Sequence, residues 1–188
     1  MIDNLFYLKK IILEVNENIK LKPLTENDIT EDYINWMNDL DITRYTEQRF
    51  QTHTYESVSN FLKNMSSSEK NLFFGIFFDE KHIGSIKIGS INFFHNTADI
   101  SYLIGSKNSW GKGIATLSIK IMLSIGFKNL KLKKITAGVY KKNIPSIRVL
   151  EKNGFTCEGN LKQQFLCDQE RVDGLIYAKF LSENKIKR

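Results

Sequence analysis

The sequence predicts one α/β domain of the α+β type, in which a mixed, mostly antiparallel sheet of six to seven strands has helices on both faces. Between residues 71 and 104, aromatic and β-branched runs alternate with short turns, which indicates three consecutive antiparallel strands. A long apolar helix over residues 113–130 lies between two strand-like segments, which is typical of a parallel pair joined by a crossover helix. Residues 155–180 indicate a final hairpin.

The N-terminal part of the chain adds edge strands and two helices to this sheet. Residues 1–17 form an N-terminal extension that predicts an edge strand over 10–15, and the alternation over 19–24 predicts a short strand. A capping box at Thr25 to Asp28 predicts the start of the first helix, because a hydroxyl and a carboxylate there satisfy two orphan amides. Residues 39–50 are irregular, polar and aromatic, and a second helix starts at Thr54.

Length and composition fit a single globular domain over residues 1–188. Hydrophobic residues make up 41% and charged residues 26% of the 188 positions. The net charge of +6 favours anionic partners. The lysines are dispersed, with the densest groups at 131–134, 141–142 and in the tail 185–188. A dispersed surplus is typical of a solvated surface, so we expect no nucleic-acid partner.

The chain lacks the patterns of exported, membrane and metal-binding proteins. Its longest apolar run, residues 72–78, is far too short to cross a bilayer, and residues 1–15 do not resemble a signal peptide. We therefore expect a cytoplasmic protein without a membrane partner. Cys157 and Cys167 lack metal-ligand spacing, so the sequence predicts no metal site and no disulfide.

The segment from Ser109 to Ala115 carries the clearest chemical signal. It places Gly111, Lys112 and Gly113 between a strand and a buried helix. The first amides of a helix lack partners and carry partial positive charge, so phosphate binds there readily. Glycines let the backbone approach the anion closely. An ordinary glycine turn explains the two glycines equally well when they are considered alone.

Three segments on the expected elements together resemble the GNAT acetyltransferase superfamily over roughly residues 19–180. Its pyrophosphate loop, Gln/Arg-x-x-Gly-x-Gly/Ala, is similar to Trp110-Gly-Lys-Gly-Ile-Ala115, with Trp in place of Gln or Arg. Asn143-Ile-Pro-Ser-Ile-Arg-Val-Leu-Glu-Lys-Asn-Gly-Phe155 and Ala98-Asp-Ile-Ser-Tyr102 also match one branch. That branch includes ribosomal-protein N-terminal, amino-sugar and polyamine acetyltransferases.

The resemblance implies a GNAT fold whose two central strands splay apart, with acetyl-CoA as co-substrate and no metal. The pantetheine arm would pair with the unpaired edge of the strand that ends near Ile104, as an added strand does. Arg148 and Lys152 would either reach the 3′-phosphate or be plain surface charges. The implied cofactor-binding residues are Leu103, Ile104, Trp110, Gly111, Lys112, Gly113, Ala115, Thr116, Asn143, Ser146, Arg148 and Lys152.

Acetyl transfer to an amine needs a route for the amine proton and a donor for the leaving thiolate. The resemblance makes Asp99 the candidate base, with an ordinary solvent-facing aspartate as the alternative. Many family members carry a tyrosine acid at the position of Leu150 here, so the acid is Ser146, Tyr102 or a water. Asn143 is either a helix N-cap alone or also a pantetheine contact.

The acceptor pocket of the family is roofed by the segment that corresponds to residues 41–50. A surface loop with a local ion pair is the alternative for this segment. Arginine suits phosphate or carboxylate, and Glu47 suits an amine or sugar hydroxyls. The candidate acceptor residues are Trp36, Tyr45, Glu47, Arg49 and Asp173.

The function expected from the sequence is acetyl transfer from acetyl-CoA to the primary amine of a small molecule, with a nucleotide-linked amino sugar as first choice. Acetylation of a protein N-terminus and of a polyamine are the alternatives, and the basic balance disfavours the polyamine. A non-catalytic CoA-binding module is the rival from another class. A homodimer stays open, with residues 1–17 as its candidate contact.

Overall fold

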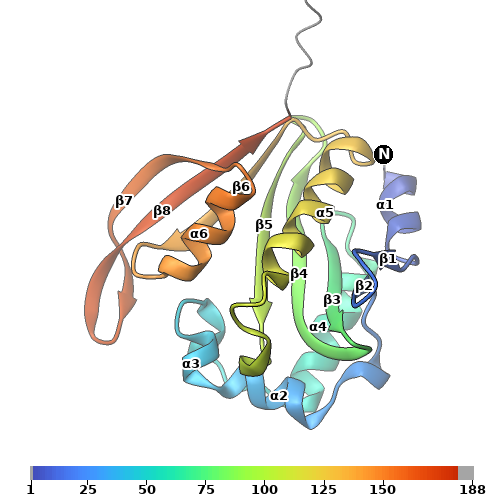
Figure 1. The fold of residues 1–188 in the computed structure, drawn as a ribbon, viewed down its shortest axis with the longest axis horizontal. Helices are drawn as coiled ribbons and strands as arrows, with labels where there is room; N and C mark the ends of the chain where they lie inside the picture. The colour runs from blue at the N-terminus through green and yellow to red at the C-terminus, as the bar shows by residue number, and fades with distance from the viewer. Residues whose placement is uncertain (1, 182–188) are drawn as a thin grey trace, which may run out of the picture.

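The computed structural model describes residues 2–181, which form one sheet of eight strands in the order β1-β2-β3-β4-β5-β6-β8-β7 (Figure 1). Every neighbouring pair is antiparallel except β5 and β6. The expected mixed, mostly antiparallel GNAT sheet is thus confirmed, and β1 at the edge raises the strand number to eight. The strands are β1 (Leu13–Glu14), β2 (Ile19–Lys22), β3 (Leu72–Phe78), β4 (Lys81–Asn92), β5 (Thr97–Ile104), β6 (Lys134–Tyr140), β7 (Thr156–Cys167) and β8 (Glu170–Phe180).

Helices cover both faces of this sheet. Figure 1 shows α5 and α6 in front of the sheet, α4 behind it, and α2 and α3 below its lower edge. The crossover from β5 through α5 to β6 makes the one parallel pair, as the sequence predicts. The α-helices are α1 (Ile2–Leu8), α2 (Glu31–Asn38), α3 (Leu40–Thr43), α4 (Tyr55–Ser67), α5 (Ile114–Lys128) and α6 (Ile144–Lys152), and the 3₁₀ turns are η1 (Glu26–Asp28), η2 (Glu47–Phe50) and η3 (Lys107–Ser109).

The main core lies between the front face of the sheet and helices α1, α5 and α6. Its buried side chains come from every strand from β2 to β6 and from helices α1, α5 and α6. Ile119 and Met122 of α5 and Ile135 of β6 are fully buried in it. A smaller cluster behind the sheet joins α2 to α4 through Tyr33, Val58 and neighbouring apolar residues. The front core therefore buries one face of β5 and β6, whereas the smaller cluster packs on β3 through Phe73.

The pairing of β5 with β6 is short, although both strands are central. Residues 97–99 pair with residues 134–136, and no pair follows Asp99 and Thr136. Beyond this point β5 stays paired with β4, and β6 stays paired with β8. The strands therefore part over residues 100–104, and one edge of each is left without a strand partner. Figure 1 shows this opening toward the lower end of the sheet.

The N-terminal residues depart from the prediction in two places. Residues 2–8 form helix α1, which the sequence analysis did not foresee, and the expected edge strand is reduced to Leu13–Glu14. The capping box at Thr25 starts only a 3₁₀ turn, and the true helix α2 begins after its own N-cap, Thr30. Short polar segments carry cap signals that more than one turn can use.

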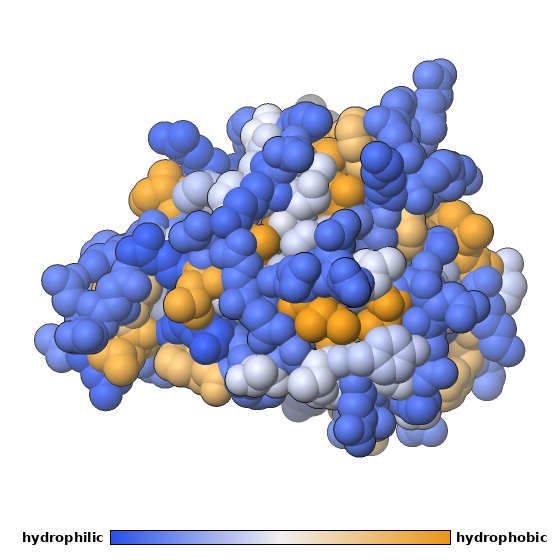
Figure 2. All heavy atoms as spheres, turned by 90° about the horizontal axis from the view of Figure 1, so that it is seen from below, coloured by the Kyte–Doolittle hydropathy of each residue, from blue (hydrophilic) through white to orange (hydrophobic). Residues whose placement is uncertain are grey.

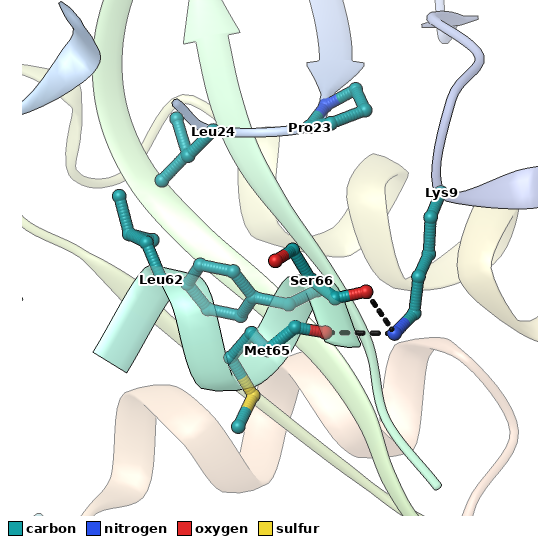
Figure 3. A pocket seen from close by; sticks show the side chains of 7 residues that line it. Lys9, Pro23, Leu24, Leu62, Met65 and Ser66 are labelled. Atoms are coloured by element: carbon teal, nitrogen blue, oxygen red, sulfur yellow. Dashed lines mark hydrogen bonds between the residues drawn. The ribbon is translucent and has the colours of Figure 1, made fainter. Parts of the chain in front are cut away.

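Lys9 fastens the N-terminal segment to the end of helix α4. Its ammonium donates hydrogen bonds to the carbonyls of Met65 at 2.7 Å, Ser66 at 3.1 Å and Ser68 at 2.5 Å. Figure 3 shows the side chain beside a cavity of about 40 Å³. The last carbonyls of a helix lack partners within the helix, so a lysine here completes its C-terminus.

The face seen from below in Figure 1 is mostly hydrophilic, with a small apolar area near its centre (Figure 2). Among residues 2–181, no helix is long and apolar enough to cross a membrane. Within the same range, no three His, Cys, Asp or Glu side chains are grouped to hold a metal ion. The lysine-rich tail 185–188 lies outside the described residues.

Replacing Lys9 by Met should lower the free energy of unfolding by about 1–2 kcal/mol, because three carbonyls at the end of α4 lose their donor while the apolar stem is kept. Urea denaturation measures the loss. Lys10→Met is the matched control, since Lys10 is exposed. Equal stability of the two variants would contradict this account of Lys9.

Candidate active site

Helix α5 begins with its amides free of any side-chain cap. The residue before it, Gly113, has φ of 77°, and Gly111 has φ of 75°; both are left-handed conformations that favour glycine. A Cβ atom at either position would meet nothing within 4 Å, so open space lies beside both. The exposed helix start and the two turns fit a phosphate group.

Trp110 ties this loop back to the end of β5. Its indole N–H donates to the carbonyl of Ile104 at 2.8 Å, while the ring stays half-exposed. This bond satisfies a backbone group of β5 in the region where β6 has parted from it. Trp110 therefore takes a structural part in the loop, and the loop geometry does not depend on the Gln or Arg of the family pattern.

The other predicted cofactor residues lie around this helix start or on α6. Ala115 and Thr116 are in the first turn of α5, and the ammonium of Lys112 lies 5.4 Å from the ring centre of Phe78. Leu103 and Ile104 are half-buried on the part of β5 that β6 does not pair. Arg148 and Lys152 are exposed on α6.

Tyr102 of β5 and Ser146 of α6 meet on the front face of the sheet. Their hydroxyl oxygens are 2.8 Å apart, and the Tyr102 hydroxyl also lies 3.5 Å from the Ser146 carbonyl. Asn143 caps α6 by accepting from the Ser146 amide at 3.3 Å, as predicted. Burial raises the pKa of Tyr102 to about 12, so its hydroxyl keeps its proton at neutral pH.

Asp99 lies on the opposite face of the sheet from Tyr102. Side chains alternate along a strand, and Ala98 and Ile100 belong to the front core while Asp99 does not. Asp99 pairs with Thr136 at the last register position before the strands part. The candidate base Asp99 is thus on the rear face, where the paired part of the two strands ends. The candidate acids Tyr102 and Ser146 are on the front face, beside the part where the strands have separated.

A second polar group, behind the gap, is centred on Tyr140. This buried residue ends β6, and its hydroxyl donates to Oε1 of Glu47 at 2.7 Å. Arg49 donates to the same hydroxyl at 3.0 Å. Phe165 stacks on the Tyr140 ring with 4.0 Å between centroids, and Tyr45 lies beside it at 5.7 Å. Burial, followed by the Glu47 carboxylate, raises the pKa of Tyr140.

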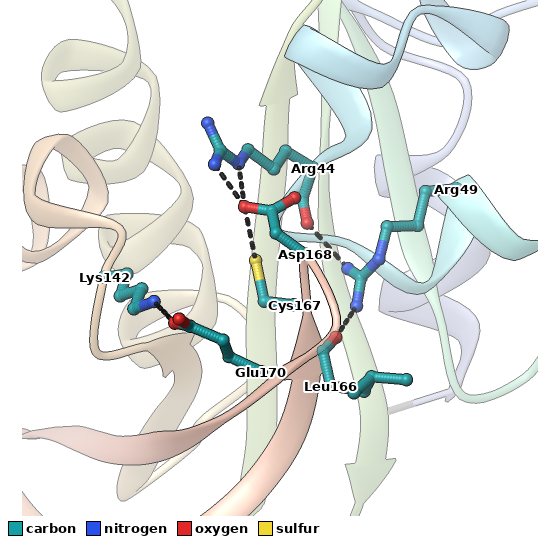
Figure 4. Close-up of polar contacts among 7 residues, drawn as sticks. All are labelled: Arg44, Arg49, Lys142, Leu166, Cys167, Asp168 and Glu170. Atoms are coloured by element: carbon teal, nitrogen blue, oxygen red, sulfur yellow. Dashed lines mark hydrogen bonds and ion pairs between the residues drawn. The ribbon is translucent and has the colours of Figure 1, made fainter.

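Arg49 holds the segment 41–50 in place. Its guanidinium donates to the carbonyls of Arg44 at 2.7 Å and Leu166 (Figure 4). It also donates to the Thr46 carbonyl at 2.8 Å and to the Tyr140 hydroxyl. Since a guanidinium has five donors, only one remains for a ligand. The prediction that Arg49 would suit a phosphate therefore meets a physical obstacle, because four of its five donors are already used.

Arg44 forms an ion pair with Asp168 at the turn of the β7–β8 hairpin (Figure 4). The pair raises the pKa of Arg44 and lowers the pKa of Asp168. Lys142 and Glu170 form a further exposed pair at 2.6 Å. Glu47, by contrast, is exposed and has no ion pair among residues 2–181. Its second oxygen is free to accept a hydrogen bond.

The remaining two acceptor candidates lie apart from this group. Trp36 of α2 packs on His82 with ring centroids 5.4 Å apart and lines a separate cleft of about 550 Å³. Asp173 accepts from the Gln163 amide at 3.0 Å and pairs with Lys141 at 3.3 Å. The Gln163 amide is the main cause that holds the pKa of Asp173 at about 2. Its local bonds account for Asp173 without a ligand.

The sequence analysis missed Tyr140, Phe165 and Arg44. Tyr140 and Glu47 are 93 positions apart, so only the folded chain brings them together. One available signal was Tyr140 itself, an aromatic residue at the end of a predicted strand and three positions before the Asn143 cap.

Comparison with known proteins fits this architecture. A family model described as an acetyltransferase (GNAT) domain matches residues 18–156. The chain belongs to this GNAT acetyltransferase family. It is an acyltransferase, and acetyl-CoA is its acyl donor.

Individual relatives of this GNAT protein act on different amines. Spermidine N(1)-acetyltransferase of Escherichia coli is 28% identical over 174 residues, which cover 89% of this chain and 91% of the relative. A spermidine N-acetyltransferase from Vibrio cholerae, solved with CoA and spermine, shares the fold with a TM-score of 0.78 at 23% identity, covering 88% of this chain and 96% of that one. RimL, a ribosomal alpha-N-protein acetyltransferase solved with coenzyme A, has a TM-score of 0.81 at 18% identity. The match covers 91% of this chain and 98% of that one.

Arg49→Met should loosen the segment 41–50, because four oxygens lose their donor, and should cost about 2 kcal/mol of stability. Hydrogen exchange should show faster exchange of this segment. Arg44→Met is the matched control: its ion pair is exposed, so stability and exchange should not change measurably. Equal exchange in the Arg49 variant and wild type would contradict the assigned role.

Proposed function

We propose that this enzyme transfers the acetyl group of acetyl-CoA to the primary amine of a small molecule that enters behind the sheet, beneath residues 41–50. The observation that carries the proposal is the parting of β5 and β6 after Asp99. On the front face, the start of α5 suits a phosphate and the Tyr102 and Ser146 hydroxyls meet. On the rear face, the Glu47 carboxylate keeps one oxygen free.

The donor would be held by the front face of the molecule. Gly111, Gly113 and the amides of Ala115 and Thr116 would take the pyrophosphate, with Lys112 adding positive charge. The free edge of β5 at Leu103 and Ile104 would pair with the pantetheine amides, and Trp110 would keep the loop closed on this edge. Arg148 and Lys152, exposed on α6, are available to the 3′-phosphate. Acetyl-CoA supplies an acyl group activated as a thioester.

Tyr102 and Ser146 would deliver the proton that the leaving thiolate needs. Either hydroxyl can donate to the other, so a proton given up by Ser146 can be replaced from Tyr102. The raised pKa of Tyr102 keeps its proton available at neutral and mildly alkaline pH. This pair takes the place of the tyrosine acid that Leu150 rules out, with Asn143 holding Ser146 in the first turn of α6.

Asp99 would accept a proton from the substrate ammonium, directly or through water, so that the neutral amine can attack the thioester carbonyl. Its position on the rear face puts it on the side from which the amine enters, and Thr136 beside it marks the last closed pair of the two strands. The reacting nitrogen thus approaches from one face while the thiolate is protonated from the other. Such a separation lets a base act on the amine and an acid act on the sulfur while the tetrahedral intermediate forms and expels the thiolate.

For the acceptor, we propose an amine whose carrier offers hydrogen-bond donors to Glu47. A nucleotide-linked amino sugar meets this requirement through its hydroxyls. Its phosphates would need cations other than Arg49, four of whose five donors are used, and Arg44, whose charge is paired with Asp168. A polyamine is the second candidate, favoured by the exposed Glu47 carboxylate, which has no ion pair among residues 2–181, and by the spermidine acetyltransferases among the relatives. A protein N-terminus is the third.

Tyr102→Phe and Ser146→Ala should each lower kcat by about 100-fold, because each breaks the route to the thiolate, while KM for acetyl-CoA should change little. The double variant should be no slower than the slower single variant. Tyr177→Phe is the matched control, since Tyr177 donates to Glu151 in a similar pair away from the gap. Wild-type kcat in both single variants would refute the assignment.

The acceptor class is decided by a thiol-release assay with amino-sugar nucleotides, spermidine and N-terminal peptides, after calorimetric titration with acetyl-CoA. Micromolar binding, worth about 8 kcal/mol, is expected. Glu47→Gln should raise KM for the accepted amine more than KM for acetyl-CoA. The increase in KM should be largest with spermidine, because the variant removes the negative charge that attracts this cation. Binding without turnover of any amine would favour a non-catalytic CoA-binding module instead.

A further inference from the structure

Gly138 is a glycine without a structural reason. It lies in the middle of the central strand β6, where glycine weakens a strand and leaves nothing to pack. Its φ is not in the left-handed region, and a Cβ atom there would meet nothing within 4 Å. By contrast, added Cβ atoms at Gly84 and Gly174 would collide with the Leu103 carbonyl and the Phe165 ring. Nothing in the fold requires a glycine at position 138.

The position of Gly138 suggests a functional reason. Thr136, Gly138 and Tyr140 alternate onto the rear face of β6, the face on which Tyr140 binds Glu47. Had the pairing with β5 continued past Asp99, Ser101 would lie opposite Gly138.

Gly138 and Ser101 are both exposed, although they are in the middle of an eight-stranded sheet. Two small residues on the facing edges of the gap thus leave the sheet open from behind. The front side of the same gap carries Tyr102 and Ser146.

We propose that Gly138 is a specificity-determining residue, whose missing side chain keeps open the passage by which the acceptor reaches the gap between β5 and β6. This inference rests on the proposed function and names the acceptor more closely. The space beside Gly138 accommodates substituents on the carbon that bears the amine. The enzyme therefore accepts primary amines on ring or branched carbons, and a side chain at position 138 restricts it to amines on CH₂ carbons.

The test compares Gly138→Ala and Gly138→Val with wild type on two acceptors that differ at the amine-bearing carbon. Glucosamine carries the amine on a ring carbon, and 6-amino-6-deoxyglucose carries it on a CH₂ group. For glucosamine, kcat/KM should fall at least about 10-fold in Gly138→Ala and further in Gly138→Val. For 6-amino-6-deoxyglucose, kcat/KM should fall less than about threefold in Gly138→Ala. The Kd for acetyl-CoA should stay unchanged.

Thermal denaturation separates this effect from damage to the fold. Because valine suits a strand and a Cβ atom at this position meets nothing within 4 Å, Gly138→Val should have an unchanged or higher Tm. Gly159→Ala and Gly159→Val are the matched controls. Gly159 is also a strand glycine with room for a Cβ, 3.9 Å from Ile176, and lies in the outer strand β7. Both controls should keep wild-type activity.

The possible results are distinct. Active wild type together with equal rates for Gly138→Val on both acceptors overturns the inference alone, as does wild type that acetylates only amines on CH₂ carbons. Loss of acetyl-CoA binding or of Tm in the Gly138 variants would show a structural role and also overturn it. Wild type that binds acetyl-CoA and acetylates no amine overturns the proposed function, and the inference falls with it.

Discussion

The short pairing between β5 and β6 is the constraint on which the rest of the molecule depends. Three register positions hold the strands together, and beyond Asp99 each strand keeps its other neighbour but loses this one. An unpaired backbone edge in the middle of a sheet is costly unless another group occupies it. Burial of the front core by α5 and α6 keeps the strands apart, and the gap connects two faces that an ordinary sheet would separate.

Each face of the gap has its own supports. In front, the crossover helix places its bare start beside the end of β5, and the Asn143 cap orients Ser146 toward Tyr102. Behind, Glu47 is held through Tyr140, which is itself fixed by Phe165 and Arg49. On the front, the start of α5 and the Asn143 cap each come from a continuous segment, and Tyr102 meets Ser146 through a tertiary contact. The residues behind are joined only by tertiary contacts.

This difference explains how far the sequence could predict the site. The regular elements follow from local patterns, and caps such as Thr54 and Asn143 satisfy helix amides within three residues. The contact of Tyr140 with Glu47 and the bond from Arg49 to the distant Leu166 carbonyl depend on the packing of the β7–β8 hairpin. The same limit applies to Asp173, whose bonds to Gln163 and Lys141 arise from a bulged hairpin that no short pattern encodes.

The attachment of residues 41–50 to the β7–β8 hairpin has an evolutionary consequence. Arg44 and Arg49 bind the hairpin at Asp168 and Leu166, and neither contact involves α5 or α6. Residues 41–50 are also linked to the segment before α5 by the ion pair of Asp41 with Lys107. Mutations that spare this pair can accumulate in the two peripheral segments without removing a contact to α5 or α6. With the acceptor site proposed above, a lineage can therefore exchange one amine for another through changes in these segments, which fits a family whose members share a fold and differ in what they modify.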